Sequence, residues 1–104
     1  MTKEELINLC NKWAKIIKVN PKEIRIRKSK KWWGFCTSDG IITFNQALLK
    51  LPVEYAEYVV VHELLHLITP NHGRLFETLL FTYLPNWEQL EASLDSFATE
   101  EILC

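Results

Sequence analysis

His62-Glu63-Leu64-Leu65-His66-Leu67-Ile68-Thr69-Pro70-Asn71-His72 is the stretch around which the chain is organised. It holds all three histidines of the protein. A catalytic zinc ion takes three protein ligands and keeps its fourth position for water. The spacing His-Glu-x-x-His on a helix supplies two of those ligands and a general base. The crowding of the histidines therefore favours a metal site in this stretch.

The first part of the stretch lies in a segment that is predicted to be a buried helix. Residues 55–68 are apolar on nearly every side, which is typical of a helix surrounded by other elements. Pro52 suits the first position of this helix. Pro70 ends it, because the residue before a proline is disfavoured in the α region. Burying the polar side chains of the motif in such a helix would cost free energy unless they bind a ligand, so their presence indicates a functional role.

Helical geometry places the candidate ligands on one face. His62 and His66 lie about 40° apart, one turn above the other, and Glu63 flanks the pair. The turn after the helix lets His72 fold back beside the helix end as the third ligand. Glu77, on the following segment, is the alternative third ligand. We prefer His72 because imidazole suits zinc.

This arrangement predicts metal-assisted hydrolysis. A zinc ion held by the three histidines would activate a water molecule. Glu63 would take a proton from that water and pass it to the leaving amine. Tyr83 and Arg74 are candidates for stabilising the oxyanion, although a structural role is the simpler interpretation of both. Three imidazoles also accept other divalent ions, so the sequence favours zinc without excluding them.

Two other interpretations of the motif stay open. A structural zinc site would close its fourth position with a Cys or a His, and Cys36 is the cysteine nearest to a plausible rim. Alternatively, the histidines are hydrogen-bonded core residues that hold no metal. The His-Glu-x-x-His motif alone arises by chance in unrelated helices, so the rest of the chain has to decide.

Further helices are predicted on both sides of the motif. Residues 2–19 form an amphipathic helix that begins with a capping box. Residues 46–50 form a short helical turn. Asn71 can cap a helix over residues 72–84, and a last helix follows over residues 87–98.

Three short strands are predicted between the first helix and the motif. Residues 23–28 alternate between polar and apolar side chains, as in a half-buried strand. Residues 32–37 and 41–45 flank Asp39-Gly40, a strong hairpin signal. We therefore expect an α+β fold with a small, mostly antiparallel sheet packed on the motif helix.

Length and composition predict one compact domain over residues 1–104. A hydrophobic content of 48% argues against disorder, and no segment is long and apolar enough to span a bilayer. The N-terminus lacks the layout of a secretory signal. Cys10, Cys36 and Cys104 are an odd number without a disulfide spacing, which fits a reducing compartment. We therefore expect a cytoplasmic protein.

Charge is unevenly distributed along the chain. Residues 1–31 hold ten Lys or Arg against three Glu, whereas residues 32–104 hold two basic residues against ten acidic ones. The basic segment 22–31 could bind nucleic acid. A solvated surface that complements the acidic part of the chain is the simpler interpretation. The alternative function is thus a nucleic-acid-associated module with a structural or vestigial metal site.

Three blocks of the sequence, in order, resemble the YgjP-like metallopeptidases, which are related to the SprT and WLM zinc peptidases. Residues 33–45, beginning Trp-Gly-Phe-Cys, are similar to the tryptophan-glycine hairpin of that family. Leu51-Pro52 followed by residues 58–66 resembles its catalytic helix, and residues 70–76 resemble the segment with its third ligand. The chain departs from the family in being short before the hairpin and in carrying Phe35 where a small residue is expected.

The resemblance implies a zincin-type fold and a zinc peptidase. It makes His62, His66 and His72 the zinc ligands and Glu63 the catalytic acid and base. The substrate would be an extended peptide laid along an edge strand of the hairpin sheet. Because the SprT and WLM groups include peptidases that act on proteins attached to DNA, the resemblance is also compatible with a nucleic-acid partner for the basic segment.

Overall fold

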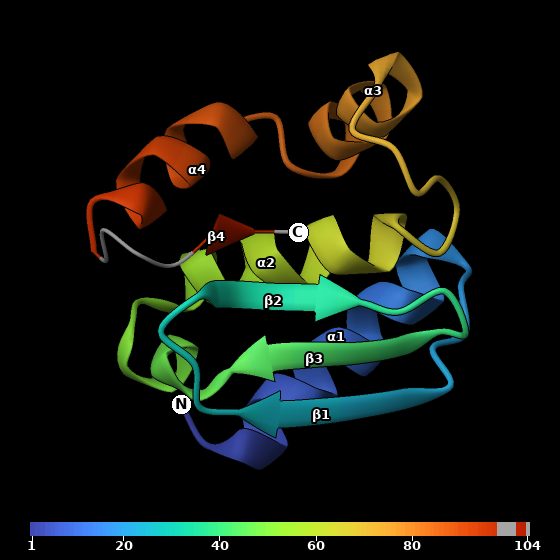
Figure 1. Cartoon of the computed structure of the whole chain (residues 1–104). Helices are drawn as coiled ribbons and strands as arrows, with labels where there is room; N and C mark the ends of the chain where they lie inside the picture. Colours follow the sequence, from blue (N-terminus) through green and yellow to red (C-terminus); the bar gives the residue numbers. More distant parts are fainter. Residues whose placement is uncertain (98–101, 104) are drawn as a thin grey trace.

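The computed structural model describes residues 1–97 and 102–103. A sheet is covered on one face by two helices, α1 and α2, and two further helices, α3 and α4, lie together beyond its β4 edge (Figure 1). The α2 helix packs against α1, the sheet, α3 and α4, so it is the central element. The predicted α+β class is confirmed.

The first helix, α1 (Lys3–Ile17), begins at the predicted capping box. The Thr2 hydroxyl accepts a hydrogen bond from the Glu5 amide at 3.1 Å, and the Glu5 carboxylate accepts one from the Thr2 amide at 2.8 Å. Lys18 ends the helix in the left-handed conformation, with φ 67°. The buried face of α1 packs against α2 and is made of Leu6, Cys10, Ala14 and Ile17.

Four strands form the sheet in the order β1-β3-β2-β4. They are β1 (Glu23–Arg27), β2 (Trp32–Cys36), β3 (Ile41–Asn45) and β4 (Ile102–Leu103). The β2–β3 pair is antiparallel, as the Asp39-Gly40 signal predicts, whereas β1–β3 and β2–β4 are parallel. The sheet is therefore mixed, which corrects the expectation of a mostly antiparallel one.

The position of β3 explains the mixed sheet. The chain reverses between β1 and β2, but β3 lies between these two strands and so runs parallel to β1. A tight turn at Gly40 (φ 93°) precedes β3. The Gly40 carbonyl accepts a hydrogen bond from the Lys22 amide at 2.8 Å, which joins the start of β3 to the start of β1. Alternation along each strand predicts which face is buried but not which neighbour the strand takes.

A 3₁₀ helix, η1 (Gln46–Lys50), leads from β3 into α2 (Val53–Leu65). The Asn45 side chain accepts a hydrogen bond from the Ala47 amide at 3.0 Å and so caps η1. Pro52 is the N-cap of α2 rather than its first helical residue. From Tyr58 to Leu65 every residue of α2 is buried, as predicted for a helix that is apolar on nearly all sides. Within the described part of the chain, no helix is long and apolar enough to cross a membrane.

The last two helices are α3 (Arg74–Tyr83) and α4 (Trp87–Asp95). The α3 helix begins two residues later than predicted, with Gly73 as its N-cap and no side-chain cap, so the expected capping role of Asn71 is wrong. Residues 70–73 form instead an irregular loop that carries His72. The α4 helix ends at Asp95 with Ser96 as its C-cap, so the prediction that it continues to residue 98 is wrong, although residue 98 itself lies outside the described residues.

Candidate metal centre

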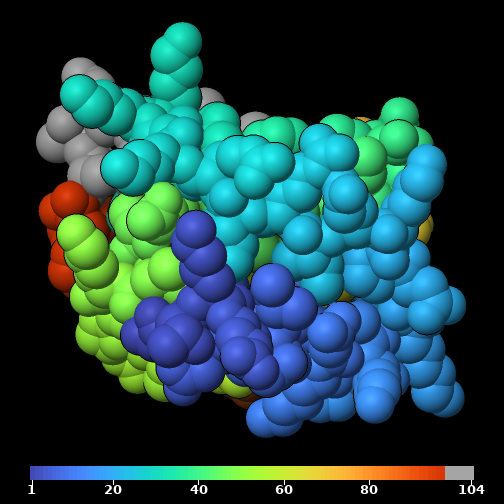
Figure 2. Space-filling model, turned by 90° about the horizontal axis from the view of Figure 1, so that it is seen from below, coloured from blue at the N-terminus to red at the C-terminus, as the bar shows by residue number. Residues whose placement is uncertain are grey.

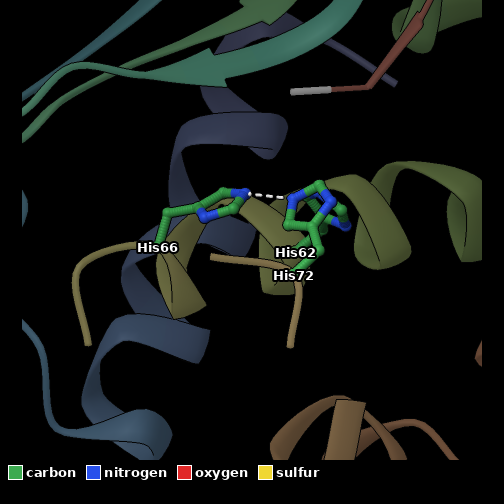
Figure 3. Close-up of side chains that lie close together, drawn as sticks. All are labelled: His62, His66 and His72. Atoms are coloured by element: carbon green, nitrogen blue, oxygen red, sulfur yellow. Dashed lines mark hydrogen bonds between the residues drawn. The ribbon is translucent and has the colours of Figure 1, made fainter. Parts of the chain in front are cut away.

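The three histidines meet at the exit of α2 (Figure 3). One ring nitrogen of each of His62, His66 and His72 lies within 4.8 Å of the others. The Nε2 atoms of His66 and His72 are 2.9 Å apart. Among the described residues, this is the one group of three or more His, Cys, Asp or Glu side chains arranged to hold a metal ion. The structure thus brings the predicted ligands together.

The α2 helix carries two of these residues in different surroundings. His62 is buried in the last turn, and the ring of Tyr58, one turn earlier, lies edge-on to it at 5.8 Å. His66 is the C-cap and half-buried. Its Nδ1 lies 3.3 Å from the Thr69 carbonyl oxygen, and this contact leaves Nε2 directed toward His72. A backbone carbonyl behind a ligating imidazole fixes both its tautomer and its orientation.

Glu63 is fully buried beside the histidines. Neither of its carboxylate oxygens has a hydrogen-bond partner in the described part of the chain. Burial therefore raises its pKa well above the ordinary value of 4.5. A buried carboxyl group without partners is costly, and Glu63 directly follows the buried His62 in the last turns of α2.

The wall opposite Glu63 is the β2 strand, and Gly34 allows the two to approach closely. A Cβ atom at Gly34 would lie 3.1 Å from Val59 Cγ1, 3.2 Å from the Thr43 carbonyl oxygen and 3.3 Å from Glu63 Cγ. No larger residue fits without displacing the strand or the helix. The Trp-Gly pair in the sequence is the signal for this contact, but spacing alone does not reveal its partner.

Phe76, on α3, is a second site residue that motif reasoning misses. Its ring is 3% exposed and contacts all three histidine rings, with centroid distances of 4.7–4.9 Å. It lies nearly parallel to His66 and His72, at 25° and 29°, and edge-on to His62 at 75°. Its place one helical turn after His72 is the only sequence signal for it.

The other candidates from the sequence take no part in the cluster. Glu77 is exposed on α3 and Arg74 is exposed at the start of that helix. Tyr83 packs edge-on against Trp13 of α1 at 6.0 Å, which is a structural role. Cys36 donates a weak hydrogen bond to the Thr37 carbonyl at 3.5 Å. Burial, with Glu63 and Asp39 nearby, raises the pKa of the Cys36 thiol to about 11, and Cys36 is not among the residues whose ligand atoms converge.

A hollow of about 290 Å³ lies beside His66, lined also by Cys36, Thr37, Ser38 and Pro70. It adjoins a larger hollow that shares Thr37, Ser38, His66 and Pro70 and continues to the C-terminal end of α1. The β2 strand pairs in parallel with β4 at Trp32 and Gly34, and with β3 along its other edge. The strand that forms the wall of the site therefore has neighbours on both sides.

Comparison with known proteins identifies the fold and the family. The family model for the YgjP-like metallopeptidase domain matches residues 1–97. The chain belongs to this family. The predicted resemblance is therefore confirmed, and the protein is a member of a group of metallopeptidases, which act on proteins or peptides. No curated protein matches the sequence.

Two solved structures from archaea share the fold. The metallopeptidase zymogen of Pyrococcus abyssi abylysin matches with a TM-score of 0.82 and 23% identity, over 93% of this chain and 98% of that one. The metallopeptidase zymogen of Methanocaldococcus jannaschii jannalysin matches with a TM-score of 0.77 and 20% identity, over 88% of this chain and 94% of that one. At such identities the similarity establishes the fold alone.

Proposed function

We propose that this chain is a zinc-dependent peptidase in which His62, His66 and His72 hold the metal and Glu63 is the catalytic acid and base. The observation that carries the proposal is the burial of Glu63, without a partner, beside three imidazoles whose nitrogens converge. A carboxyl group in this position would be a liability in a site built only for structure. Three imidazole ligands suit zinc and leave its fourth position open.

The residues divide the chemistry among them. When bound, zinc supplies a Lewis acid that polarises a carbonyl and lowers the pKa of a water molecule. Glu63 accepts the proton that the attacking water loses and returns it to the leaving amine. Burial raises the pKa of Glu63 in the metal-free chain, and the positive charge of a bound zinc ion would favour the carboxylate that acts as the base. The Thr69 carbonyl keeps the His66 ring in its ligating orientation.

The β2 strand is the wall that would receive the substrate. An extended peptide can pair with the edge of a sheet through its main chain, whatever its side chains are. The hollow beside His66 would then accept one substrate side chain next to the scissile bond. Its volume of about 290 Å³ and its mixed lining of Cys36, Thr37, Ser38 and Pro70 favour a side chain of moderate size.

Zinc content and the Glu63→Gln variant test the proposal together. We expect the purified protein to bind one zinc ion per chain and to hydrolyse a quenched fluorescent peptide library at a low rate, because β4 pairs with the β2 edge. Glu63→Gln should keep the zinc and lose about 10²–10⁴-fold of the hydrolysis, the usual contribution of a general acid–base group. Glu77→Gln, which changes an exposed glutamate on α3, is the matched control and should leave both unchanged. Absence of zinc, or an active Glu63→Gln, would refute the proposal.

We infer further that the chain is latent. Abylysin and jannalysin are both described as metallopeptidase zymogens. In this chain β4 pairs with the β2 edge that we assign to the substrate. A peptide cannot form main-chain hydrogen bonds along an edge that is already paired, so β4 would have to leave before the substrate could bind.

A proline in β4 tests this latency in the full-length chain. Proline cannot donate a hydrogen bond to a neighbouring strand, so Ile102→Pro should release the β2 edge and raise peptide hydrolysis. Ile102→Val keeps the strand geometry and should leave the activity as it was. Equal activity of the two variants would show that β4 does not restrict the site.

A basic face at the β1 edge of the sheet supports a second candidate function, nucleic-acid binding. Figure 2 looks onto α1, β1 and the β1–β2 loop, which together form this face. Its exposed cations are Lys15, Lys18, Lys22, Arg25, Arg27, Lys28, Lys30 and Lys31. Within the described part of the chain, these cations form one ion pair, between Arg25 and Glu23. The other cations are available to phosphates.

The surroundings of these cations favour a nucleic acid over a membrane. Lys15, Lys18 and Lys22 line a hollow of about 780 Å³ between α1 and β1. Residues two apart on a strand, such as Arg25 and Arg27, are about 6.6 Å apart, a spacing similar to that of successive phosphates. Of the large hydrophobic residues that are exposed in the described part of the chain, this face holds only Ile16, so it has little to insert into a bilayer.

Charge removal at this face tests the second candidate. We expect a short fluorescent oligonucleotide to bind at low salt, with an affinity that falls steeply as salt rises. Arg27→Gln with Lys30→Gln should weaken binding and lower the salt slope by about 2. Arg74→Gln removes an exposed cation on α3, outside the elements that form this face, and is the control. Binding to anionic vesicles alone, or an effect of Arg74→Gln equal to that of the pair, would refute it.

A further inference from the structure

The loop that carries His72 offers few contacts that could hold the His72 side chain in place. It is exposed, in an irregular loop. The next residue, Gly73, has nothing within 4 Å of the position where a Cβ would lie. The helix that follows has no side-chain cap at its N-terminus. The loop therefore does not fix the third ligand by packing or capping.

Phe76 is the residue that connects this loop to the core. It is 3% exposed, whereas its neighbours Leu75 and Glu77 are exposed. It lies in the first turn of α3, four residues after His72. The Phe76 ring lies 4.7 Å from the His72 ring and 4.9 Å from each of the two α2 histidine rings.

The rings form an ordered set. His66, His72 and Phe76 lie nearly parallel to one another, with interplanar angles of 25–29° and centroid distances of 4.7–4.9 Å. His62 is edge-on to all three. Offset and edge-on arrangements are the favourable ones for aromatic pairs. An imidazole that shares its electrons with a metal becomes electron-poor, and the electron-rich face of Phe76 attracts such a ring more strongly.

We propose that Phe76 is a positioning residue that sets the third metal ligand: it holds the His72 ring against the α2 pair and strengthens metal binding through that ring. This inference rests on the proposed zinc site. It adds to that site a residue from α3, so that the geometry of the metal depends on how α3 docks on α2. Phe76 itself binds no metal and takes no part in the chemistry.

Zinc affinity, measured by competition with a chromophoric chelator, tests the assignment. Phe76→Leu should weaken zinc binding by about tenfold or more, as the loss of residues that orient metal ligands commonly does. Phe76→Tyr keeps the ring and should restore most of the affinity. Leu80→Val changes a buried side chain one turn further along α3, away from the histidines, and is the matched control for a loss of packing. It should lower the unfolding temperature without changing the zinc affinity of the folded protein.

A double-mutant cycle with His72→Ala separates positioning from general destabilisation. If Phe76 acts through His72, Phe76→Leu should have little further effect on zinc affinity in the His72→Ala chain. The d–d spectrum of the cobalt-loaded protein should shift in Phe76→Leu and stay unchanged in Leu80→Val. If Phe76→Leu lowered the zinc affinity equally in the wild-type and His72→Ala chains, or left it unchanged in the wild type, this inference would be wrong but the proposed function would stand. A wild-type chain that binds no zinc would overturn the proposed function, and this inference with it.

Discussion

The two halves of the metal centre are built in opposite ways. His62 and Glu63 belong to a helix that is packed on all sides, and both are buried. His72 belongs to an exposed loop, followed by a glycine with open space around it. The first half is positioned by the core of the protein, whereas His72 contacts the other two histidine rings and the ring of Phe76.

The difference separates the residues that affect folding from those that affect metal binding alone. Every change in the α2 half alters the core as well as the site, because the same atoms serve both. A change in the loop half alters the site without touching the core. Matched substitutions in the two halves should therefore have the same effect on metal binding and different effects on stability.

The largest expected effect concerns the histidines. His62→Ala and His72→Ala should each weaken zinc binding by about 100-fold or more, because each removes one of three ligands. In the metal-free protein, His62→Ala should lower the free energy of unfolding by about 1–3 kcal/mol, since a buried ring is lost. His72→Ala should change it by less than about 0.5 kcal/mol. Chelator competition and urea unfolding measure the two quantities, and equal stabilities would remove the distinction between the halves.

The glycines should show the same contrast more weakly. Gly34→Ala would press a methyl group against Val59 and Glu63 and should cost about 1–3 kcal/mol of unfolding free energy, as overpacking in a core does. Gly73→Ala meets no atom and has a φ of −91°, which alanine adopts freely. Its unfolding free energy should stay within about 0.5 kcal/mol of the wild-type value. Urea unfolding of the metal-free variants checks both, and a stable Gly34→Ala would contradict the close approach.

The smallest effect concerns pH and Glu63. Because burial raises its pKa above 4.5, the folded metal-free protein keeps a proton that the unfolded chain releases. The contribution of Glu63 to stability is therefore full below pH of about 4.3 and is lost as pH rises through the folded pKa. Glu63→Gln should reduce this loss of stability with rising pH. The free energy of unfolding of the metal-free variant should then exceed that of the wild type by about 1 kcal/mol at neutral pH. Glu77→Gln should keep the wild-type profile, and a Glu63→Gln profile that does the same would refute the argument.

Local signals predicted most of the site. The helix around His62 follows from its apolar surroundings, and the turn at Pro70 brings in His72. The contacts that complete the site depend on tertiary packing instead. The approach of Gly34 to Glu63 requires the β2 strand to lie directly over α2, and the role of Phe76 requires the docking of α3. Neither contact leaves a periodic trace in the sequence.

The same division holds for the fold, in which local structure was predicted and long-range pairing was not. The hairpin around Asp39-Gly40 is a local structure, and its strands are where the sequence predicts them. The insertion of β3 between β1 and β2 is a long-range choice that alternation does not encode. The start of α3 was missed by two residues because Asn71 offers a capping side chain that the loop does not use.

The strand order also has a consequence for how the protein folds. The β2–β3 hairpin pairs residues that are close in sequence, such as Cys36 with Ile42, whereas β1 pairs Glu23 with Ile41 across the whole of β2. Closing the longer loop costs more chain entropy, so the hairpin can form early and β1 joins afterwards. The strand that forms the wall of the site therefore belongs to the part of the sheet that assembles first. Slow steps in refolding should arise at the β1 edge, away from the metal centre.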